Sequence, residues 1–263
     1  MTQTETDRSV EGRSVEGRVV IVTGAARGLG RDYARMLVRD GAKVALADVN
    51  SDAVVATAKE IATEVKGSEV LGLAVDVTDA DSIAAMVAAV IEAWGTVDIL
   101  INNAGIWGDL EPAPLSATKA SYFDLVIAVN LRGPLLCTQA VLEPMRAQGW
   151  GRIINISSMG AYMPSGVYGV SKLGLNQMTY ALATELGSSG ITVNAVAPGP
   201  IDNEATRSQL PEAAFQKMIA GTAMKRMGTG SDLYGMIHYL ASTAADWVTG
   251  QTFLVNGGYN SRL

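Results

Sequence analysis

An apolar, β-branched run followed by a glycine-rich turn and a helix constrains the fold of this chain more than any other feature. The run spans 18–23, the turn spans 23–30, and helical periodicity continues through Val38. An apolar run without alternation is typical of a strand buried on both faces. Glycines let the backbone approach a ligand closely, and the helix N-terminus offers N–H groups to a pyrophosphate. The unit therefore predicts a dinucleotide site, although a purely structural glycine turn is an alternative.

The same alternation of apolar runs and helical stretches continues along the chain. It predicts further strands at 43–47, 69–75, 97–101, 151–156, 191–196 and 252–256, and helices near 51–65, 81–94, 117–131, 134–147, 167–187 and 231–242. Strands that alternate with helices form a parallel sheet covered on both faces. The sequence therefore predicts an α/β fold, a doubly wound parallel β-sheet of the Rossmann type, in one domain of residues 18–263.

Two segments stand outside this pattern. Residues 1–17 are polar and carry a short tandem repeat, Arg8–Gly12 followed by Arg13–Gly17, which we interpret as a flexible tail whose second copy leads into the first strand. Residues 201–228 follow a strand end and have weak periodicity, which is typical of a lid over a binding site. A packed pair of surface helices is an equally good interpretation of that segment.

Charge and the scarcity of reactive side chains exclude several classes of function. The net charge is −6, without a basic stripe, which argues against a nucleic-acid partner. The single cysteine, Cys137, and the single histidine, His238, allow no disulfide and no His/Cys metal site, and both lie in apolar helical runs as structural residues. Without a membrane-length apolar run or a signal-peptide core, the chain is expected to be cytoplasmic.

Acidic and amide side chains follow the predicted strands where they end, and ligands of such sheets collect there. Asp48 ends the second strand, where an acid can accept hydrogen bonds from the adenosine ribose and repel a 2′-phosphate. This favours NAD over NADP, although Arg27 in the glycine turn could pair with a phosphate. Asp76 and the segment Asn103–Gly105 end the next two strands, with turn chemistry as the alternative for the asparagine.

A tyrosine and a lysine, Tyr168 and Lys172, are spaced to share one face of a predicted long helix. A nearby ammonium favours the phenolate of a tyrosine, whose ordinary pKa is about 10. Taken alone, the pair could be an ordinary surface pair. Further candidates are Asn130, which needs partners inside an apolar helical segment, and the serines Ser157 and Ser158 at a strand end.

Taken together, these motifs resemble the short-chain dehydrogenase/reductase family over residues 14–263. They run in order as Thr23-Gly…Gly28-x-Gly30, Asn102-Asn-Ala-Gly105, Asn130, Ser157-Ser158, Tyr168-x-x-x-Lys172 and Pro198-Gly199.

The resemblance implies NAD(P)-dependent hydride transfer between an alcohol and a carbonyl, and it implies a homotetramer built through the last strand and the helices at 117–147 and 167–187. Tyr168 would be the general acid/base, and Lys172 would lower its pKa and hold the nicotinamide ribose. Ser158 would bond the substrate oxygen, and Asn130 would hold a water near Lys172. The implied cofactor-binding residues, with no metal, are Gly24, Arg27, Gly28, Leu29, Gly30, Asp48, Val49, Asp76, Val77, Asn103, Ala104, Gly105, Tyr168, Lys172, Pro198, Gly199 and Ile201.

Two departures from the family pattern lead to specific expectations. Ser158 precedes Tyr168 by 10 residues, fewer than is usual in the family, so we expect a reshaped substrate pocket, and Ser157 stays an alternative. Asn203 replaces a threonine that often contacts the cofactor carboxamide, so we expect a changed contact there.

Three functions are compatible with these features. The first is an NAD-dependent dehydrogenase or reductase of a secondary alcohol or ketone, with oxidation favoured by the preference for NAD. The second is an NADPH-dependent 3-oxoacyl thioester reductase, against which Asp48 argues. The third is a non-catalytic dinucleotide sensor, since fold alone does not fix function. A moderately hydrophobic substrate is expected from the apolar candidates Trp107, Leu110, Tyr162, Met163, Met218 and Met224.

Overall fold

The computed structural model describes residues 14–107, 114–209 and 211–259. Within them, parallel strands form a 7-stranded sheet in the order β3-β2-β1-β4-β5-β6-β7. This order reverses between β1 and β4, as in doubly wound folds, so the predicted fold is confirmed. The strands are β1 (Val19–Thr23), β2 (Lys43–Asp48), β3 (Val70–Ala74), β4 (Ile99–Asn102), β5 (Gly151–Ile156), β6 (Ile191–Pro198) and β7 (Thr252–Val255).

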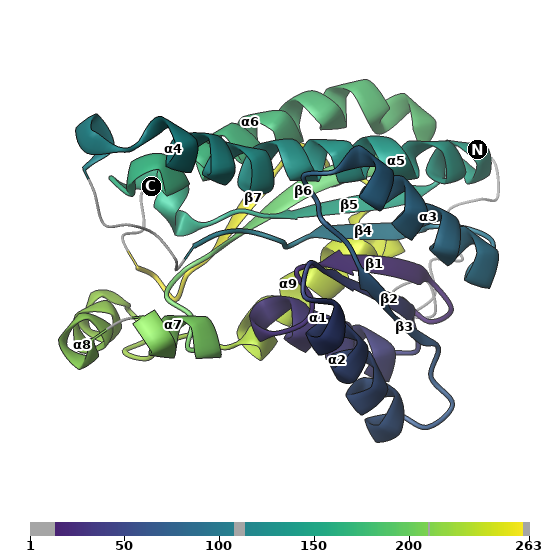
Figure 1. Cartoon of the computed structure of the whole chain (residues 1–263), viewed down its shortest axis with the longest axis horizontal. Coiled ribbons are helices and arrows are strands. Elements are labelled where there is room, and N and C mark those ends of the chain that lie inside the picture. Colours follow the sequence, from purple (N-terminus) through teal and green to yellow (C-terminus); the bar gives the residue numbers. More distant parts are fainter. Residues whose placement is uncertain (1–13, 108–113, 210, 260–263) are drawn as a thin grey trace, which may run out of the picture.

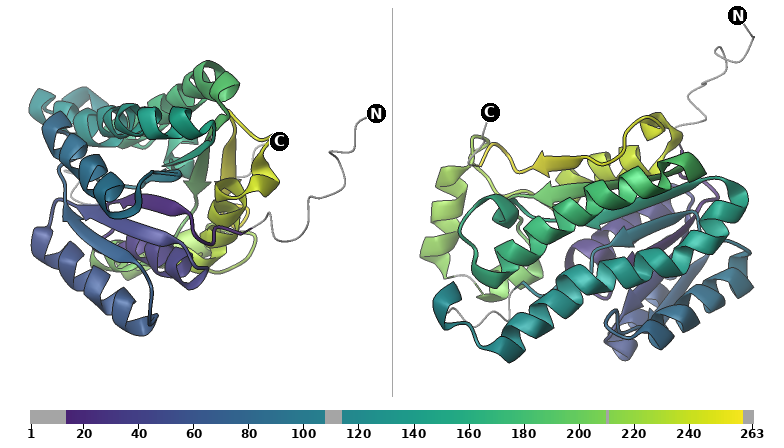
Figure 2. Two further views of the ribbon diagram at one scale, coloured as in Figure 1. Left: turned by 90° about the vertical axis from the view of Figure 1, so that its right-hand side faces the viewer. Right: turned by 90° about the horizontal axis from the view of Figure 1, so that it is seen from above.

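Helices cover both faces of the sheet (Figures 1 and 2). One face carries α1, α2 and α9, and the other carries α3, α5 and α6. Two short helices, α7 and α8, lie beyond the carboxyl ends of the strands. The helices are α1 (Gly28–Arg39), α2 (Ser51–Glu64), α3 (Ala80–Trp94), α4 (Ala120–Ile127), α5 (Gly133–Gln148), α6 (Gly166–Leu186), α7 (Glu204–Gln209), α8 (Glu212–Gly221) and α9 (Gly230–Ala241).

The strand β1 shows why the strand segments of this sequence are apolar at every position. All of its residues are buried, and Val20 and Val22 pack into the cluster that contains residues of α1 and α9. Val19 and Ile21 pack into the opposite cluster, with residues of α3 and α5. Successive side chains of a strand point to opposite faces, so a strand covered on both sides needs apolar residues at every position.

Residues 14–17 of the predicted N-terminal tail belong to the described structure. Residues 1–13 lie outside the described residues, but Val15 is fully buried in the core. The N–H of Gly17 donates to the carbonyl of Gly41 at 2.9 Å, and Gly17 adopts a φ of +71° that favours glycine. Residues 14–17 therefore form an ordered entry to β1, anchored by the side chain of Val15.

The helices predicted at 117–131 and 134–147 form one continuous path. A π-helical turn, Ala128–Arg132, joins α4 to α5, and the N–H of Gly133 bonds to the carbonyl of Ala128. Pro134 follows at the first turn of α5, where a missing N–H is tolerated. The sequence predicts two helices here, the first ending at 131 and the second beginning at 134. Turns of this kind are frequent at functional sites, and this one contains the fully buried Asn130.

The path Ala120–Gln148 is long and apolar enough to span a membrane by length and composition alone. A core helix of a soluble protein meets the same criteria, so this is weak evidence for a span. In α5, Cys137 is fully buried, and burial raises the pKa of its thiol to about 12, which confirms it as a core residue. In α4, Phe123 and Leu125 remain 39% and 49% exposed. The path therefore packs on the sheet while leaving apolar surface outside.

Candidate active site

The glycine turn after β1 and the loop after β4 are bonded to each other. The hydroxyl of Thr23 accepts from the N–H groups of Asn103 at 3.1 Å and Ala104 at 3.0 Å. The Asn103 amide donates to the carbonyls of Thr23 at 2.9 Å and Gly24 at 3.0 Å. Asn103 is therefore a clamp between two cofactor-binding candidates, beyond simple turn chemistry. The sequence signal for the Thr23 hydroxyl was one polar residue at the end of an apolar strand.

Gly30 and Gly28 serve the turn for different reasons. A Cβ on Gly30 would lie 2.3 Å from the carbonyl oxygen of Gly24 and 2.6 Å from Nδ2 of Asn103. A Cβ on Gly28 would have nothing within 4 Å, but its φ is +58°. Gly30 thus provides close approach, and Gly28 provides a left-handed backbone.

Replacing Gly30 by alanine is expected to separate α1 from the clamp. We expect a loss of about 3 kcal/mol in unfolding free energy, typical of severe overpacking, and at least a hundredfold weaker dinucleotide binding. The matched variant Gly28→Ala meets only backbone strain of about 1 to 2 kcal/mol. Urea denaturation and NADH fluorescence titration measure both effects. Equal losses in the two variants would contradict this account of the turn.

Asp48 is held in place beside the glycine turn. Its Oδ2 accepts from the N–H of Ala26 at 3.1 Å, and its Oδ1 accepts from the N–H of Asn50 at 3.0 Å. Arg27 is exposed, and Val49 is 74% exposed. The Asp48 carboxylate is therefore a fixed negative charge at this edge. The exposed side chains of Arg27 and Val49 are not fixed by packing.

The two candidates that follow β3, Asp76 and Val77, have different environments. The exposed Asp76 carboxylate accepts from the N–H and the hydroxyl of Thr78, at 2.8 and 2.7 Å. These bonds, the backbone one first, hold the pKa of Asp76 below its usual range. Val77 is buried, and its side chain lies where a Cβ on Gly133 would touch it at 3.1 Å. Of these two residues, only Asp76 presents its side chain to solvent.

The turn after β6 is packed against β7. The N–H of Gly199 donates to the carbonyl of Val255 at 3.0 Å, and a Cβ on Gly199 would lie 2.4 Å from the Cα of Asn256. Pro198 ends β6, and Ile201 is buried. Leu29, another cofactor candidate, lies on α1 and is partly buried against the core cluster that contains residues of α1 and α9.

Asn203 has a local structural role. Its side-chain oxygen accepts from the N–H and the hydroxyl of Thr206, at 2.9 and 3.1 Å. This is N-terminal capping of α7, which threonine also performs well. The oxygen is committed to the helix, so the changed contact expected at Asn203 would use its amide nitrogen.

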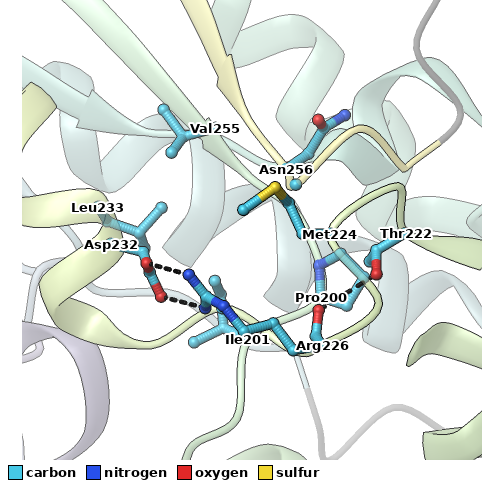
Figure 3. A pocket seen from close by; sticks show the side chains of 11 residues that line it. Pro200, Ile201, Thr222, Met224, Arg226, Asp232, Leu233, Val255 and Asn256 are labelled. Atoms are coloured by element: carbon cyan, nitrogen blue, oxygen red, sulfur yellow. Dashed lines mark hydrogen bonds and ion pairs between the residues drawn. The ribbon is translucent and has the colours of Figure 1, made fainter.

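Two backbone bonds close the segment 201–228 into a loop with adjacent ends. The N–H of Gly228 donates to the carbonyl of Pro200 at 2.9 Å. The N–H of Asp202 donates to the carbonyl of Gly228 at 2.8 Å. Beside them lies a cavity of about 190 Å³, with the pair Arg226–Asp232 on its wall (Figure 3). Within the segment, no described residue of α8 is fully buried.

Of the two serines after β5, Ser158 faces the tyrosine. Its hydroxyl is hydrogen-bonded to Tyr168 and accepts from the N–H of Gly160 at 3.0 Å. Ser157 is 3% exposed, and its hydroxyl donates to the carbonyl of Lys172 at 3.4 Å. The shorter loop still brings Ser158 to Tyr168, because a tight turn at Met159–Tyr162 folds back, with Gly160 against the Tyr168 ring.

Tyr168 and Lys172 lie on α6 with the ammonium 5.8 Å from the ring centroid. The ammonium donates to the carbonyl of Ile156 at 2.8 Å. Burial raises the pKa of Tyr168 to about 12, while its bond with Ser158 acts in the opposite direction. Burial lowers the pKa of Lys172 to about 8. From the sequence we expect Lys172 to lower the pKa of Tyr168. In this structure the pKa of Tyr168 is raised, because burial of the phenol is the largest effect.

Asn130 joins α5's entry to the loop after β4. Its Oδ1 accepts from the N–H of Ile106 at 2.8 Å, and its Nδ2 donates to the Ile106 carbonyl at 3.0 Å and to Ser171 Oγ at 3.2 Å. A Cβ on Gly105 would lie 3.3 Å from the Asn130 Oδ1 and 3.5 Å from the Lys172 ammonium. Ser171 was not expected from the sequence, where its only signal was its place beside Lys172.

These contacts bring together side chains from distant parts of the chain. Asn130 and Lys172 meet beside Gly105, and Ser158 meets Tyr168, which lies one helical turn before Lys172 on α6. Two hydroxyls in contact can hold one oxygen atom and pass it a proton. Among the substrate-pocket candidates, Leu110 lies outside the described residues. His238 lies away from the site on α9, 3.6 Å from Asp40.

Comparisons with known proteins cover nearly the whole chain. A family model described as enoyl-(acyl carrier protein) reductase matches residues 24–260. An uncharacterized oxidoreductase of Mycobacterium tuberculosis is 44% identical over 243 residues, which is 92% of this chain and 97% of that protein. Sorbitol dehydrogenase of Cereibacter sphaeroides is 39% identical over 258 residues (93% and 98%).

Two further proteins are similar over the same length. The 3-oxoacyl-[acyl-carrier-protein] reductase of Pseudomonas aeruginosa is 40% identical over 250 residues (93% and 98%). The crystal structure of a short-chain type dehydrogenase/reductase from Mycobacterium marinum superposes with a TM-score of 0.87 at 31% identity, covering 96% of this chain and 99% of that one.

Proposed function

This chain belongs to the short-chain dehydrogenase/reductase family, and we propose that it is an NAD-dependent oxidoreductase of a secondary alcohol or ketone. The observation that carries the proposal is the contact between the hydroxyls of Ser158 and Tyr168 beside the buried Lys172. A nicotinamide cofactor, when bound, would supply or accept the hydride. The glycine turn fits such a cofactor, because a Cβ on Gly28 would have nothing within 4 Å, which leaves the N-terminus of α1 open to a pyrophosphate.

The residues divide the proton chemistry in the proposed reaction. With a pKa of about 12, the Tyr168 phenol holds its proton at neutral pH and can give it to a carbonyl oxygen in reduction. Ser158 donates to the same oxygen and stabilises the negative charge that develops there. Oxidation needs the phenolate, which positive charge near the ring favours; Lys172, still protonated below a pKa of about 8, contributes it.

The preference for NAD rests on Asp48. Its carboxylate is fixed by two backbone N–H groups, so it cannot turn away from a 2′-phosphate without losing them. Like charges about 4 Å apart cost on the order of 4 kcal/mol at an effective dielectric of 20, before screening.

Replacing Asp48 by asparagine is expected to raise kcat/KM for NADP relative to NAD by about 10- to 100-fold. The amide keeps an acceptor for Ala26 but removes the charge. The matched control is Asp52→Asn, an exposed acid in the first turn of α2. Initial rates with both cofactors give the ratio. A wild-type enzyme that already prefers NADP would refute the argument and make Arg27 the decisive residue.

A reductase of 3-oxoacyl thioesters is the second candidate. The name of the Pseudomonas relative and the description of the family model favour acyl thioester substrates. The two candidates separate in one assay series: NADH formation from aliphatic, aryl and polyol secondary alcohols between pH 7 and pH 9, and NADPH consumption with a 3-oxoacyl thioester at neutral pH. Tight NADH binding without turnover of any substrate would instead favour the sensor function.

A homotetramer is proposed with this function. The outer face of α6 carries Val170, Leu173 and Tyr180, which are 44%, 53% and 60% exposed, and the neighbouring α4 exposes Phe123 and Leu125. Apolar surface of this kind marks interfaces. The segment 201–228 is proposed as the substrate lid, supported by its adjacent ends and the loose packing of α8.

Placing a charge on this face is expected to dissociate the assembly. Leu173→Glu would bury a carboxylate without a partner, so light scattering after size exclusion should give a lower molar mass than for wild type. Lys59→Glu on α2, on the opposite face of the sheet, is the control. An unchanged molar mass for Leu173→Glu would exclude this helix from the interface.

A further inference from the structure

The buried hydroxyl of Ser171 lies between the tyrosine and the asparagine of the proposed site. We propose that Ser171 is a positioning residue that fixes the orientation of the Asn130 amide and so holds the catalytic helix α6 against the loop after β4. This inference rests on the proposed function for its consequence in catalysis. Ser171 is fully buried on α6, one position before Lys172 and three after Tyr168.

The hydrogen-bonding capacity of the Ser171 hydroxyl allows one orientation of the Asn130 amide, which is the orientation that the N–H and carbonyl of Ile106 also require. Ser171 has one proton, and it donates this proton to the carbonyl of Tyr168 at 2.7 Å. Only a lone pair then faces Asn130, so the atom of Asn130 at 3.2 Å from it must be a donor. The amide nitrogen therefore points to Ser171, and the amide oxygen points to the N–H of Ile106.

The Asn130 amide is fully satisfied in this orientation. Both of its N–H groups are used, one by Ser171 and one by the Ile106 carbonyl, and its oxygen accepts from Ile106. Without the Ser171 hydroxyl, one buried N–H loses its acceptor, a state that proteins avoid. The side chain would then turn or shift to recover a partner, and the bond that it accepts from Ile106 would weaken.

That bond joins the two halves of the proposed site. Ile106 follows Gly105, which lies against both Asn130 and the Lys172 ammonium. Ser171 belongs to the helix that carries Tyr168 and Lys172. The chain of bonds from Tyr168 through Ser171 and Asn130 to Ile106 therefore sets the distance between the proton donor and the edge where the cofactor is proposed to lie.

The same helix offers a matched control two turns further along. Thr179 is also fully buried, donates to the carbonyl of Leu175 at 2.8 Å, and accepts from the amide of Asn155 at 2.9 Å. The variants Ser171→Ala and Thr179→Ala therefore remove the same kind of hydroxyl from the same kind of network. Of these two hydroxyls, only that of Ser171 is bonded to Asn130.

The first measurement does not depend on turnover. Amide hydrogen exchange of the full chain should show the Ile106 N–H exchanging about tenfold faster in Ser171→Ala than in wild type, and at the wild-type rate in Thr179→Ala. Equal Ile106 exchange in wild type and Ser171→Ala would overturn the proposal.

The second measurement is kinetic. Ser171→Ala is expected to lower kcat about tenfold with little change in KM for the cofactor, and to have no further effect in an Asn130→Ala background. Thr179→Ala should leave kcat unchanged. Additive losses in the double variant would show that Ser171 does not act through Asn130 and would overturn the proposal. Absence of turnover in wild type would count against the proposed function alone, and the Ile106 exchange would still decide this inference.

Discussion

Replacing Tyr168 by phenylalanine is expected to lower kcat by about 10²- to 10⁴-fold, the usual contribution of a positioned general acid or base. The phenol is the group in contact with Ser158, and the substitution removes only its hydroxyl. Dinucleotide affinity should change little, because the glycine turn and Asp48 lie on other elements. Initial rates with the best alcohol from the substrate panel, together with NADH titration, measure both quantities.

The control for this substitution is Tyr180→Phe on the same helix. Tyr180 is 60% exposed, so loss of its hydroxyl should leave kcat unchanged. If Tyr168→Phe kept more than about a tenth of the wild-type kcat, Tyr168 would not be the proton donor, and Ser158 would become the candidate. If it lost NADH binding as well, the substitution would be acting on the fold of the site.

The elements that could be predicted from sequence are those whose signal is periodic. The strand at 18–23 and the helix after it follow from an unbroken apolar run and a helical repeat, and the parallel order of the strands makes their carboxyl ends converge. This is why Asp48, Asn103 and Ser158 could be expected at one edge before their contacts were known. The π-helical turn at Ala128–Arg132 could not be expected, because one extra residue leaves no periodic trace.

The partners of the site residues were harder to predict than the residues themselves. The choice between Ser157 and Ser158 depends on which face of a strand end each side chain takes, and the structure turns Ser157 to the carbonyl of Lys172. The bond from Lys172 to the Ile156 carbonyl joins a helix to a backbone atom, and no residue type signals it. Ser171 was missed for the same reason, since a serine inside a helix usually has only local partners.

Replacing Lys172 by methionine is expected to abolish turnover and yet stabilise the fold at neutral pH. The side chain is 5% exposed, and burial lowers the pKa of its ammonium from 10.5 to about 8. A difference of this size corresponds to about 3 kcal/mol of unfavourable free energy for the charged form in the folded chain. The variant also leaves the Ile156 carbonyl without its donor, and this loss offsets about 1 kcal/mol of the gain from removing the buried charge. The net expectation is a gain of about 2 kcal/mol in unfolding free energy.

The sign of the pH dependence follows from proton binding in the two states. Below pH 8 both the folded and the unfolded chain hold the Lys172 proton, and the cost of burying the charge is complete. Between pH 8 and 10.5 the unfolded chain binds more protons than the folded one, so the wild type gains stability with rising pH. The advantage of Lys172→Met should therefore be largest at pH 7 and should have disappeared by about pH 10.5.

Urea denaturation of both proteins at pH 7 and near pH 10 measures this difference, with Lys59→Met on the surface of α2 as the control that should not depend on pH. A variant less stable than wild type at pH 7 would mean that the ammonium stabilises the fold through its bond to Ile156, and that its burial carries no cost. A stabilised but inactive variant would mean that the chain keeps a buried charge at the expense of stability. Such a charge is retained for what it does beside Tyr168, because packing alone would favour its removal.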